Sequence, residues 1–280
     1  MKGPTRDRRL VLYTDLDGTL LDAETYSHEA AGPALEAIRS RGALLVLCSS
    51  KTRAEMEPIG RALGLRAPFI VENGGAIYLP REEFATLVPE AEPCGSWVRI
   101  ALGTPRAQLL ACLADLKQRL AVPVVGWSDL APEAIARECG LSLEEAQRAM
   151  RREFDEPFRL ESDDPQVLSQ MATIVAEHGL RLMRGGRYFH LVGASDKGRA
   201  VRALTDILRR RFGAIFTVGL GDSENDAPML AEVDLPVLVR RPSGEPDPAV
   251  LRLVPHARVT SGIGPAGWNE AVLAILAGDG

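Results

Sequence analysis

The sequence predicts an α/β protein that has a parallel-sheet core and an inserted α+β domain. Short apolar runs alternate with helical patterns through residues 10–71 and again from residue 197 onward. Such alternation is typical of βαβ units, which build parallel sheets covered by helices on both faces. The regularity changes near residue 84, where several extended segments follow one another at closer spacing. We therefore expect residues 1–84 and 190–280 to form the core, and residues 85–189 to form the insert.

The first part of the core is expected to contain three strands separated by two helices. The first apolar run carries Val and Tyr and is too short for a helix, so it favours a strand. Gly42 is expected to close the first helix, and the capping box of Thr52 and Glu55 to open the second. In order, the elements are a strand at 10–14, a helix at 29–40, a strand at 43–48, a helix from 52 to about 64, and a strand at 69–71.

The insert is expected to build an antiparallel sheet with helices beside it, after which the core resumes. A second capping box, of Ser142 and Glu145, opens one of the helices. The insert is expected to hold strands at 96–102, 122–127, 157–161, 180–184 and 188–192 and helices at 105–120, 142–153 and 165–178. The resumed core is expected to hold a helix at 197–212, strands at 214–218 and 236–239, a loop at 242–248 and a helix at 267–277.

Composition excludes several classes of protein. The chain has 280 residues, 46% of them hydrophobic, and its apolar runs fall short of the roughly 20 residues that span a bilayer. Because the N-terminal segment lacks a signal-peptide pattern, we expect a cytoplasmic protein without membrane contact. A net charge of −5 argues against a nucleic-acid partner. The four cysteines and four histidines are scattered, which predicts reduced thiols and argues against a zinc site.

The motif DLDGTLL at residues 15–21 follows the first predicted strand. Alternate side chains of an extended segment share a face, so Asp15 and Asp17 are expected to point the same way. Gly18 then allows a tight turn. Two carboxylates held this close need a counter-charge, and oxygen ligands of this kind suit Mg²⁺. The alternative is a solvated acidic turn.

Three further motifs are expected to meet this one, mostly where strands end. GDSEND carries Asp222, Asn225 and Asp226, CSSKT carries Ser49, and SDKG carries Lys197. Lysine is rare here, at positions 2, 51, 117 and 197 among 33 basic residues, so a lysine in SDKG is not readily explained as generic surface charge. Ligands of open parallel sheets bind beyond the carboxyl ends of the strands. Acids, a hydroxyl and an ammonium at that edge are what phosphoryl transfer requires.

In their order along the chain, which is DLDGTLL, CSSKT, SDKG and GDSEND, the four motifs resemble those of the haloacid dehalogenase superfamily of phosphatases. Four other segments resemble the mannosyl-3-phosphoglycerate phosphatase family within it. They are IVENGGAIY at 70–78, REFDEPF at 152–158, RGGRYFHL at 184–191 and GPAGWNEAV at 264–272. The resemblance covers nearly the whole chain. It implies a Rossmann-like core with an α+β cap of the C2B type, inserted between the second and third motifs.

The resemblance also implies a role for each core residue. Asp15 is the expected nucleophile and forms an aspartyl phosphate, while Asp17 protonates the leaving alkoxide and later activates water. Mg²⁺ is expected to bind the Asp15 carboxylate, the Asp17 backbone carbonyl and Asp222. Lys197 is expected to neutralise charge between nucleophile and phosphate, and Ser49 to hydrogen-bond a phosphoryl oxygen.

Two of these core roles are left with alternatives. Ser50 competes with Ser49 for the phosphoryl oxygen, and both residues are alternatively strand terminators. Asp226 either orients Lys197 or a metal-bound water, or serves only in the first turn of its helix.

Substrate specificity is expected to come mainly from the cap. Arg187 is the candidate for the substrate carboxylate, because guanidinium binds carboxylate in bidentate fashion. Glu156, His190 and Asn73 are candidates for hydrogen bonds to sugar or glycerate. The alternatives are a solvated arginine and a core histidine. Lys51 and Asn225 are expected to support the site, unless they are merely capping or exposed residues.

These expectations combine into a Mg²⁺-dependent phosphatase that converts mannosyl-3-phosphoglycerate into mannosylglycerate, a compatible solute, and phosphate. The expected partner is thus a small phosphorylated sugar-glycerate, and the chain is expected to be a monomer or homodimer. Rival interpretations are a related sugar phosphatase acting on glucosyl-3-phosphoglycerate or hexose phosphates, a phosphosugar mutase, and a non-catalytic sugar-phosphate-binding regulator. The last is disfavoured because a binding protein needs neither nucleophile nor proton shuttle.

Overall fold

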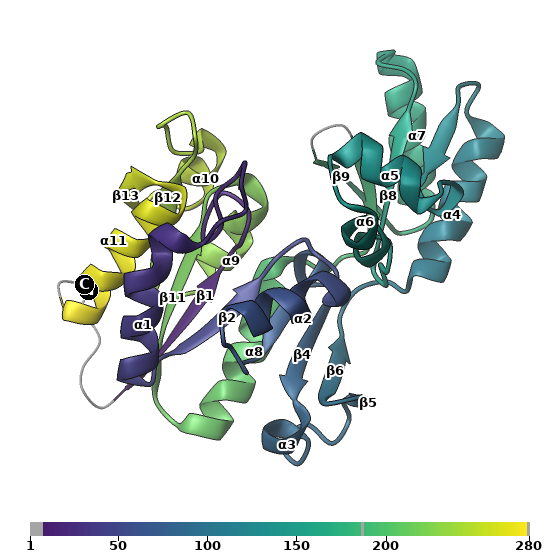
Figure 1. Cartoon of the computed structure of the whole chain (residues 1–280). Helices are drawn as coiled ribbons and strands as arrows, with labels where there is room; N and C mark the ends of the chain where they lie inside the picture. Colours follow the sequence, from purple (N-terminus) through teal and green to yellow (C-terminus); the bar gives the residue numbers. More distant parts are fainter. Residues whose placement is uncertain (1–7, 186–187, 279–280) are drawn as a thin grey trace.

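A mixed β-sheet forms the centre of the larger part of the molecule (Figure 1). In this computed structural model, which describes residues 8–185 and 188–278, the sheet has nine strands in the order β13-β12-β11-β1-β2-β3-β4-β6-β5. The strands from β13 to β3 pair in parallel and the others antiparallel. Their bounds are β1 Arg9–Thr14, β2 Leu44–Cys48, β3 Phe69–Val71, β4 Ala76–Pro80, β5 Glu92–Cys94, β6 Trp97–Ala101, β11 Ile215–Gly221, β12 Leu235–Arg240 and β13 Arg258–Ile263.

Helices cover both faces of this sheet, because its strands are apolar on both sides. On one face, Leu12 and Leu47 pack with α1 (Gly32–Arg41), α2 (Arg53–Ala62) and α11 (Gly264–Ala277). On the other face, Val11 and Val46 pack with the helices α3 Arg81–Phe84, α8 Lys197–Phe212, α9 Ala227–Ala231 and α10 Pro248–Leu253. The α/β core expected from the sequence is therefore present.

The second sheet belongs to the insert and is antiparallel, as expected. Its order is β7-β8-β10-β9, with β7 Val124–Gly126, β8 Asp155–Leu160, β10 Tyr188–Val192 and β9 Arg181–Gly185. The helices α4 (Arg106–Arg119) and α7 (Pro165–Glu177) pack on it around Phe158. A smaller cluster around Trp127 and Tyr188 includes α5 (Pro132–Cys139) and α6 (Leu143–Ala149). Figure 1 shows this unit standing beside the larger sheet, with α6 next to α2.

The insert begins later and ends later than the range 85–189. The strands β5 and β6 extend the large sheet through pairing of β6 with β4, so residues 92–101 belong to the core. The strand β10 pairs with β8 and β9 in the small sheet, so the insert continues to Val192. The apolar alternation of residues 96–102 predicts a strand correctly, but it does not indicate which sheet the strand joins.

Some other elements differ from expectation in extent. The helix expected over 142–153 ends at Ala149, because residues 150–154 leave it to cross toward the core and enter β8. The helices α5 and α10 and the strand β13 were not predicted. Each of these three elements is short, between six and eight residues, so its periodicity is weak.

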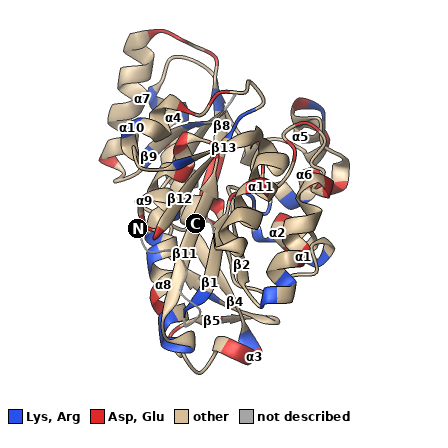
Figure 2. Ribbon diagram, turned by 90° about the vertical axis from the view of Figure 1, so that its left-hand side faces the viewer, with Lys and Arg blue, Asp and Glu red and all other residues tan. Residues whose placement is uncertain are grey.

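Charges of both signs are interspersed along the outer helices, such as α3 and α8 (Figure 2). Among the described residues, no helix is both long enough and apolar enough to cross a membrane.

Candidate active site

The predicted residues meet at the carboxyl ends of three adjacent strands. Thr14, the last residue of β1, is level with Leu47 of β2 and Leu220 of β11. Asp15 follows at this edge, and its backbone N–H donates to the carbonyl of Leu220 at 2.9 Å. Because β2 and β11 end on either side of β1, their following residues, Ser49 and Asp222, flank Asp15.

Lys197 lies at the centre of the site, although it opens a helix rather than ends a strand. Its ammonium nitrogen is 2.5 Å from Asp15 Oδ1 and 2.6 Å from Asp226 Oδ1. The lysine is 1% exposed. A charge this deep needs partners, and two carboxylates supply them. Asp196 caps the helix by accepting from the N–H of Arg199 at 2.8 Å, which fixes the position from which Lys197 projects.

Asp226 contacts Lys197, as one of the alternatives expected from the sequence requires. Its second oxygen, Oδ2, accepts the backbone N–H groups of Asp222 at 3.0 Å and Ser223 at 3.1 Å. Asp226 is fully buried. One carboxylate thus holds both the lysine and the turn that carries Asp222.

Burial, followed by the excess of acid over base, shifts the acid pKa values upward. Burial, followed by repulsion from Asp226, raises the pKa of Asp15 well above its ordinary value, against the opposing charge of Lys197. Burial and the same repulsion raise the pKa of Asp222 to about 6. The pKa of Lys197 is also raised, because attraction to Asp15 and Asp226 outweighs the opposing effect of burial. Such a cluster favours an added cation.

The acidic cluster fits a divalent metal. Asp15, Asp222 and Asp226 each offer one oxygen within 4.8 Å of the others. Since Asp226 is occupied by Lys197 and two backbone amides, the oxygens left for a cation belong to Asp15 and Asp222. Thr19 donates to Asp222 Oδ1 at 3.1 Å. Gly18, with φ of +78°, approaches so closely that a Cβ there would lie 3.1 Å from Asp222 Oδ2. Hard carboxylate oxygens of this kind suit Mg²⁺.

Asp17 forms an ion pair with Lys51. Its Oδ2 is 2.8 Å from Lys51 Nζ, while its buried Oδ1 has no hydrogen-bond partner among the residues that the structure describes. Burial would lower the pKa of Lys51, but the attraction of Asp17 overcomes it and raises that pKa. The expected supporting role of Lys51 is consistent with this position.

Ser49 and Ser50 differ in their surroundings. Ser49 is 1% exposed, and its Oγ accepts the backbone N–H of Lys51 at 3.3 Å. The carbonyl of Ser50 instead accepts from Arg152 Nη1 at 3.3 Å. Ser49 is the one embedded at the end of β2, next to β1, which favours it for the phosphate contact.

Asn73 and Asn225 are brought together from distant parts of the chain. Asn225 Nδ2 donates to Asn73 Oδ1 at 3.1 Å, and Asn225 Oδ1 accepts from Ser223 Oγ at 2.7 Å. Asn73 has a φ of +54°, a left-handed conformation that asparagine tolerates better than most residues. The pair connects the turn after β3 (η2, Glu72–Gly74) with the turn after β11 (η4, Glu224–Asp226).

The expected sugar ligands of the insert are engaged inside it. Glu156 is fully buried, bound by Arg106 at 2.6 Å and 2.8 Å and by the N–H of Ser128 at 2.8 Å. His190 Nδ1 lies 2.9 Å from Asp155 Oδ2. These arrangements argue against direct substrate contact by Glu156 and give His190 a structural partner. Arg187 lies outside the described residues.

A buried network joins the insert to the turn that follows β2. Arg152 donates to Asp155 Oδ2 at 2.6 Å as well as to Ser50. Burial would raise the pKa of Asp155, but the charges of Arg152 and His190 lower it instead. Glu72, with φ of +48°, accepts the backbone N–H of Phe154 at 2.8 Å. Burial raises the pKa of Glu72 to about 7.

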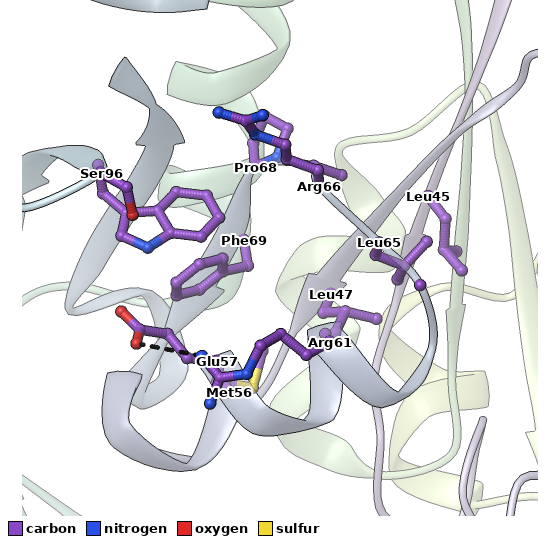
Figure 3. A pocket seen from close by; sticks show the side chains of 14 residues that line it. Leu45, Leu47, Met56, Glu57, Arg61, Leu65, Arg66, Pro68, Phe69 and Ser96 are labelled. Atoms are coloured by element: carbon purple, nitrogen blue, oxygen red, sulfur yellow. Dashed lines mark ion pairs between the residues drawn. The ribbon is translucent and has the colours of Figure 1, made fainter. Parts of the chain in front are cut away.

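Two cavities lie beside α2, and they differ in their relation to this site. The first, of about 420 Å³, lies between the helix and the strands, where Glu57 and Arg61 form an ion pair near Phe69 (Figure 3). None of the described acidic cluster lines it. The second, of about 320 Å³, includes Lys51 in its wall. The second cavity therefore adjoins Asp17.

Sequence reasoning missed several contributors to the site. Thr19 lies within the DLDGTLL motif, so its hydroxyl was available as a signal. Arg152 lies in the segment quoted for the resemblance, but its contact with Ser50 crosses from insert to core. Glu72 also lies in a segment quoted for the resemblance, but its role depends on the backbone of residues 153 and 154.

Comparisons with known proteins agree with this geometry. A family model described as haloacid dehalogenase-like hydrolase matches residues 12–89. A glucosyl-3-phosphoglycerate/mannosyl-3-phosphoglycerate phosphatase of Methanococcoides burtonii is 41% identical over 95% of this chain and 97% of its own length. One of the same name from Persephonella marina is 36% identical, again over 95% and 97%.

Solved structures share the fold at lower identity. A sugar phosphatase of haloacid dehalogenase subclass IIB, BT4131, aligns with a TM-score of 0.62 at 19% identity, over 95% of this chain and 99% of its own. The sucrose-phosphatase of Synechocystis aligns with a TM-score of 0.58 at 18% identity, over 96% and 98%. The two phosphatase relatives and the family model identify the chain as a phosphoric monoester hydrolase that belongs to the glucosyl-3-phosphoglycerate/mannosyl-3-phosphoglycerate phosphatase family.

Proposed function

We propose that the protein is a Mg²⁺-dependent phosphatase that hydrolyses mannosyl-3-phosphoglycerate to mannosylglycerate and phosphate. The observation that carries the proposal is the convergence of Asp15, Lys197 and Asp222 at one edge of the sheet. The names of the two relatives support the substrate class. They also favour glucosyl-3-phosphoglycerate as a second substrate.

Asp15 is the proposed nucleophile. One carboxylate oxygen of Asp15 attacks phosphorus, and Lys197, 2.5 Å from Oδ1, holds the carboxylate in place. The new bond joins this oxygen to phosphorus, the bond to the glycerate oxygen breaks, and an aspartyl phosphate results. The Lys197 ammonium neutralises charge on the nucleophile and on the phosphoryl group. Ser49 supplies a hydroxyl to a phosphoryl oxygen.

Asp17 is the proposed proton shuttle. Lys51 Nζ lies 2.8 Å from Asp17 Oδ2, and a phosphate group bound beside this pair would compete for the lysine. Once Lys51 turns toward the phosphate, Asp17 in its protonated form gives its proton to the leaving glycerate oxygen and becomes a carboxylate. Asp17 then accepts a proton from the water that hydrolyses the aspartyl phosphate.

Asp15, Asp222 and the Asp17 backbone carbonyl are the groups that would hold Mg²⁺. When bound, the ion offsets negative charge on the phosphoryl oxygens. This agrees with the surplus of carboxylates over ammonium groups around Lys197.

A comparison of substrates tests the proposed function. Phosphate release is measured with Mg²⁺ for mannosyl-3-phosphoglycerate, glucosyl-3-phosphoglycerate and several hexose phosphates. We expect kcat/KM to be highest for a glycosyl-3-phosphoglycerate, and the ratio of the two glycosyl substrates to identify the sugar. A higher value for a simple hexose phosphate would overturn the proposal.

A further inference from the structure

The cavity that adjoins Lys51 lies where the leaving group of the proposed reaction must extend. The leaving oxygen takes its proton from Asp17, so the remainder of the leaving group continues from the side of the site where Asp17 lies. Lys51 binds Asp17 at 2.8 Å and also forms part of the cavity wall. The cavity, of about 320 Å³, is within the usual size range of small-molecule sites.

Both parts of the molecule contribute walls to this cavity. The core supplies Leu21, Tyr26, His28 and one side of α2, and the insert supplies Leu141, Glu145 and Arg148. A hydrogen bond also joins core and insert beside the cavity, since Thr52 Oγ1 donates to the carbonyl of Arg148 at 2.9 Å.

The charges in the cavity wall balance. Lys51 and Arg148 are positive, and Glu55 and Glu145 are negative. Hydrogen bonds from Ser142 lower the pKa of Glu145, and the charges of Arg148 and Lys51 lower it further. Glu145 of the insert is therefore close enough to Lys51 of the core to be attracted by its charge. A wall with paired charges of both signs suits a neutral ligand that has many hydroxyl groups better than a second anion.

Tyr26 adds an aromatic surface that is already in place. Its side chain is 51% exposed, and Lys51 Nζ lies 5.1 Å from the ring centroid. The residue has a φ of +56°, which non-glycine residues rarely adopt. Asp22 holds this turn by accepting the N–H of Thr25 at 2.9 Å and, through its carbonyl, the N–H of Tyr26 at 3.0 Å. A ring fixed in advance loses little entropy on binding.

We propose that this cavity binds the hexosyl group of the substrate, with the ring of Tyr26 packing on the C–H face of the sugar and the charged groups of Glu55, Glu145 and Arg148 hydrogen-bonding its hydroxyls. The inference rests on the proposed function and adds to it the place where the sugar is recognised. It moves sugar recognition from Glu156 and His190, which are engaged inside the insert, to the junction of insert and core.

Substituting Tyr26 tests the subsite, because a ligand that carries the hexosyl group is expected to lose affinity and a ligand without it is not. KM is measured for mannosyl-3-phosphoglycerate, and 3-phosphoglycerate is tested as substrate or competitive inhibitor. We expect Tyr26→Ala to raise KM for the mannosyl substrate about tenfold, and to change the constant for 3-phosphoglycerate by less than about threefold. Tyr26→Phe keeps the ring and is expected to keep most of the affinity. Leu253→Ala, which removes an exposed apolar side chain outside the cavity, serves as control.

A second variant approaches the cavity from the insert. Leu141→Trp is expected to fill part of it and to reproduce the selective rise in KM, even if Tyr26→Ala disturbs its turn. The subsite would be overturned if the variants changed the constants for both ligands equally, or if both variants left KM for the mannosyl substrate unchanged. Turnover by the wild type would still support the proposed function in either case. Wild-type protein that releases no phosphate from either glycosyl-3-phosphoglycerate would instead contradict the proposed function itself.

Discussion

Lys197 and Asp15 form a buried ion pair in which the ammonium nitrogen lies 2.5 Å from Oδ1. Because the lysine also binds Asp226, its removal leaves two buried carboxylates without their cation. The same contact therefore serves stability and the proposed chemistry, and the two effects are measurable separately.

We expect Lys197→Met to abolish phosphate release and to lower the free energy of unfolding by about 3–5 kcal/mol, the usual cost of breaking a buried pair. Lys117→Met is the matched control. Lys117 pairs with Asp129 at the surface, so its loss is expected to cost about 0–1 kcal/mol. Urea denaturation measures both. Equal small losses in the two variants would show that the pair is not energetically important.

Metal binding is expected to be visible without any substrate. The proposed binding of Mg²⁺ at Asp15 and Asp222 requires the folded protein, so we expect Mg²⁺ to raise Tm in a concentration-dependent way. Asp222→Asn is expected to remove most of this rise, whereas Asp206→Asn on the surface of α8 should keep it. Chelation should abolish activity, and added Mg²⁺ should restore it. A rise in Tm that persists in Asp222→Asn would contradict the proposed site.

Glu72 is expected to make stability depend on pH near neutrality. Burial raises its pKa in the folded protein to about 7, above the ordinary value of 4.5. The folded state thus binds this proton more tightly than the unfolded state, so the stabilisation is present at low pH and is lost as pH rises through about 7.

Thermal unfolding from pH 5.5 to 8.5, a range of roughly three units around that pKa, checks this expectation. We expect Tm to fall by a few degrees across it in the wild type, and Glu72→Gln to make this fall smaller, because Asp222, whose pKa is also raised, still contributes. Glu82→Gln, at an exposed pair with Arg66, is the control. A profile that stays the same in Glu72→Gln would assign the pH dependence to other groups.

The core and its site were predictable because their signals are local. Asp15 and Asp222 each follow a continuous apolar run, and parallel strands end at a common edge, so their convergence follows from the strand pattern. Lys197 opens a strongly periodic helix. The expectation that Ser49, Lys197 and the acids lie at one edge of the sheet did not require knowledge of side-chain contacts.

The insert was harder because its assignments depend on partners distant in sequence. β6 reads as an alternating strand, but only its pairing with β4 places it in the core sheet. In the sequence, Glu156 is only an acid within an extended segment. In the structure it accepts a hydrogen bond from Arg106, which lies 50 residues earlier. Tyr26 gave no signal, since its place beside Lys51 depends on a turn with positive φ.

Trapping of a phosphorylated enzyme tests the role of Asp15 most directly. The wild type and Asp15→Asn are mixed with ³²P-labelled mannosyl-3-phosphoglycerate, quenched with acid during the first turnover, and assayed for protein-bound label that hydroxylamine releases. We expect label on the wild type alone, and no phosphate release by Asp15→Asn although it stays folded, because Asp226 still pairs with Lys197. Appreciable turnover by Asp15→Asn, or label of equal amount on both proteins, would contradict nucleophilic attack by Asp15.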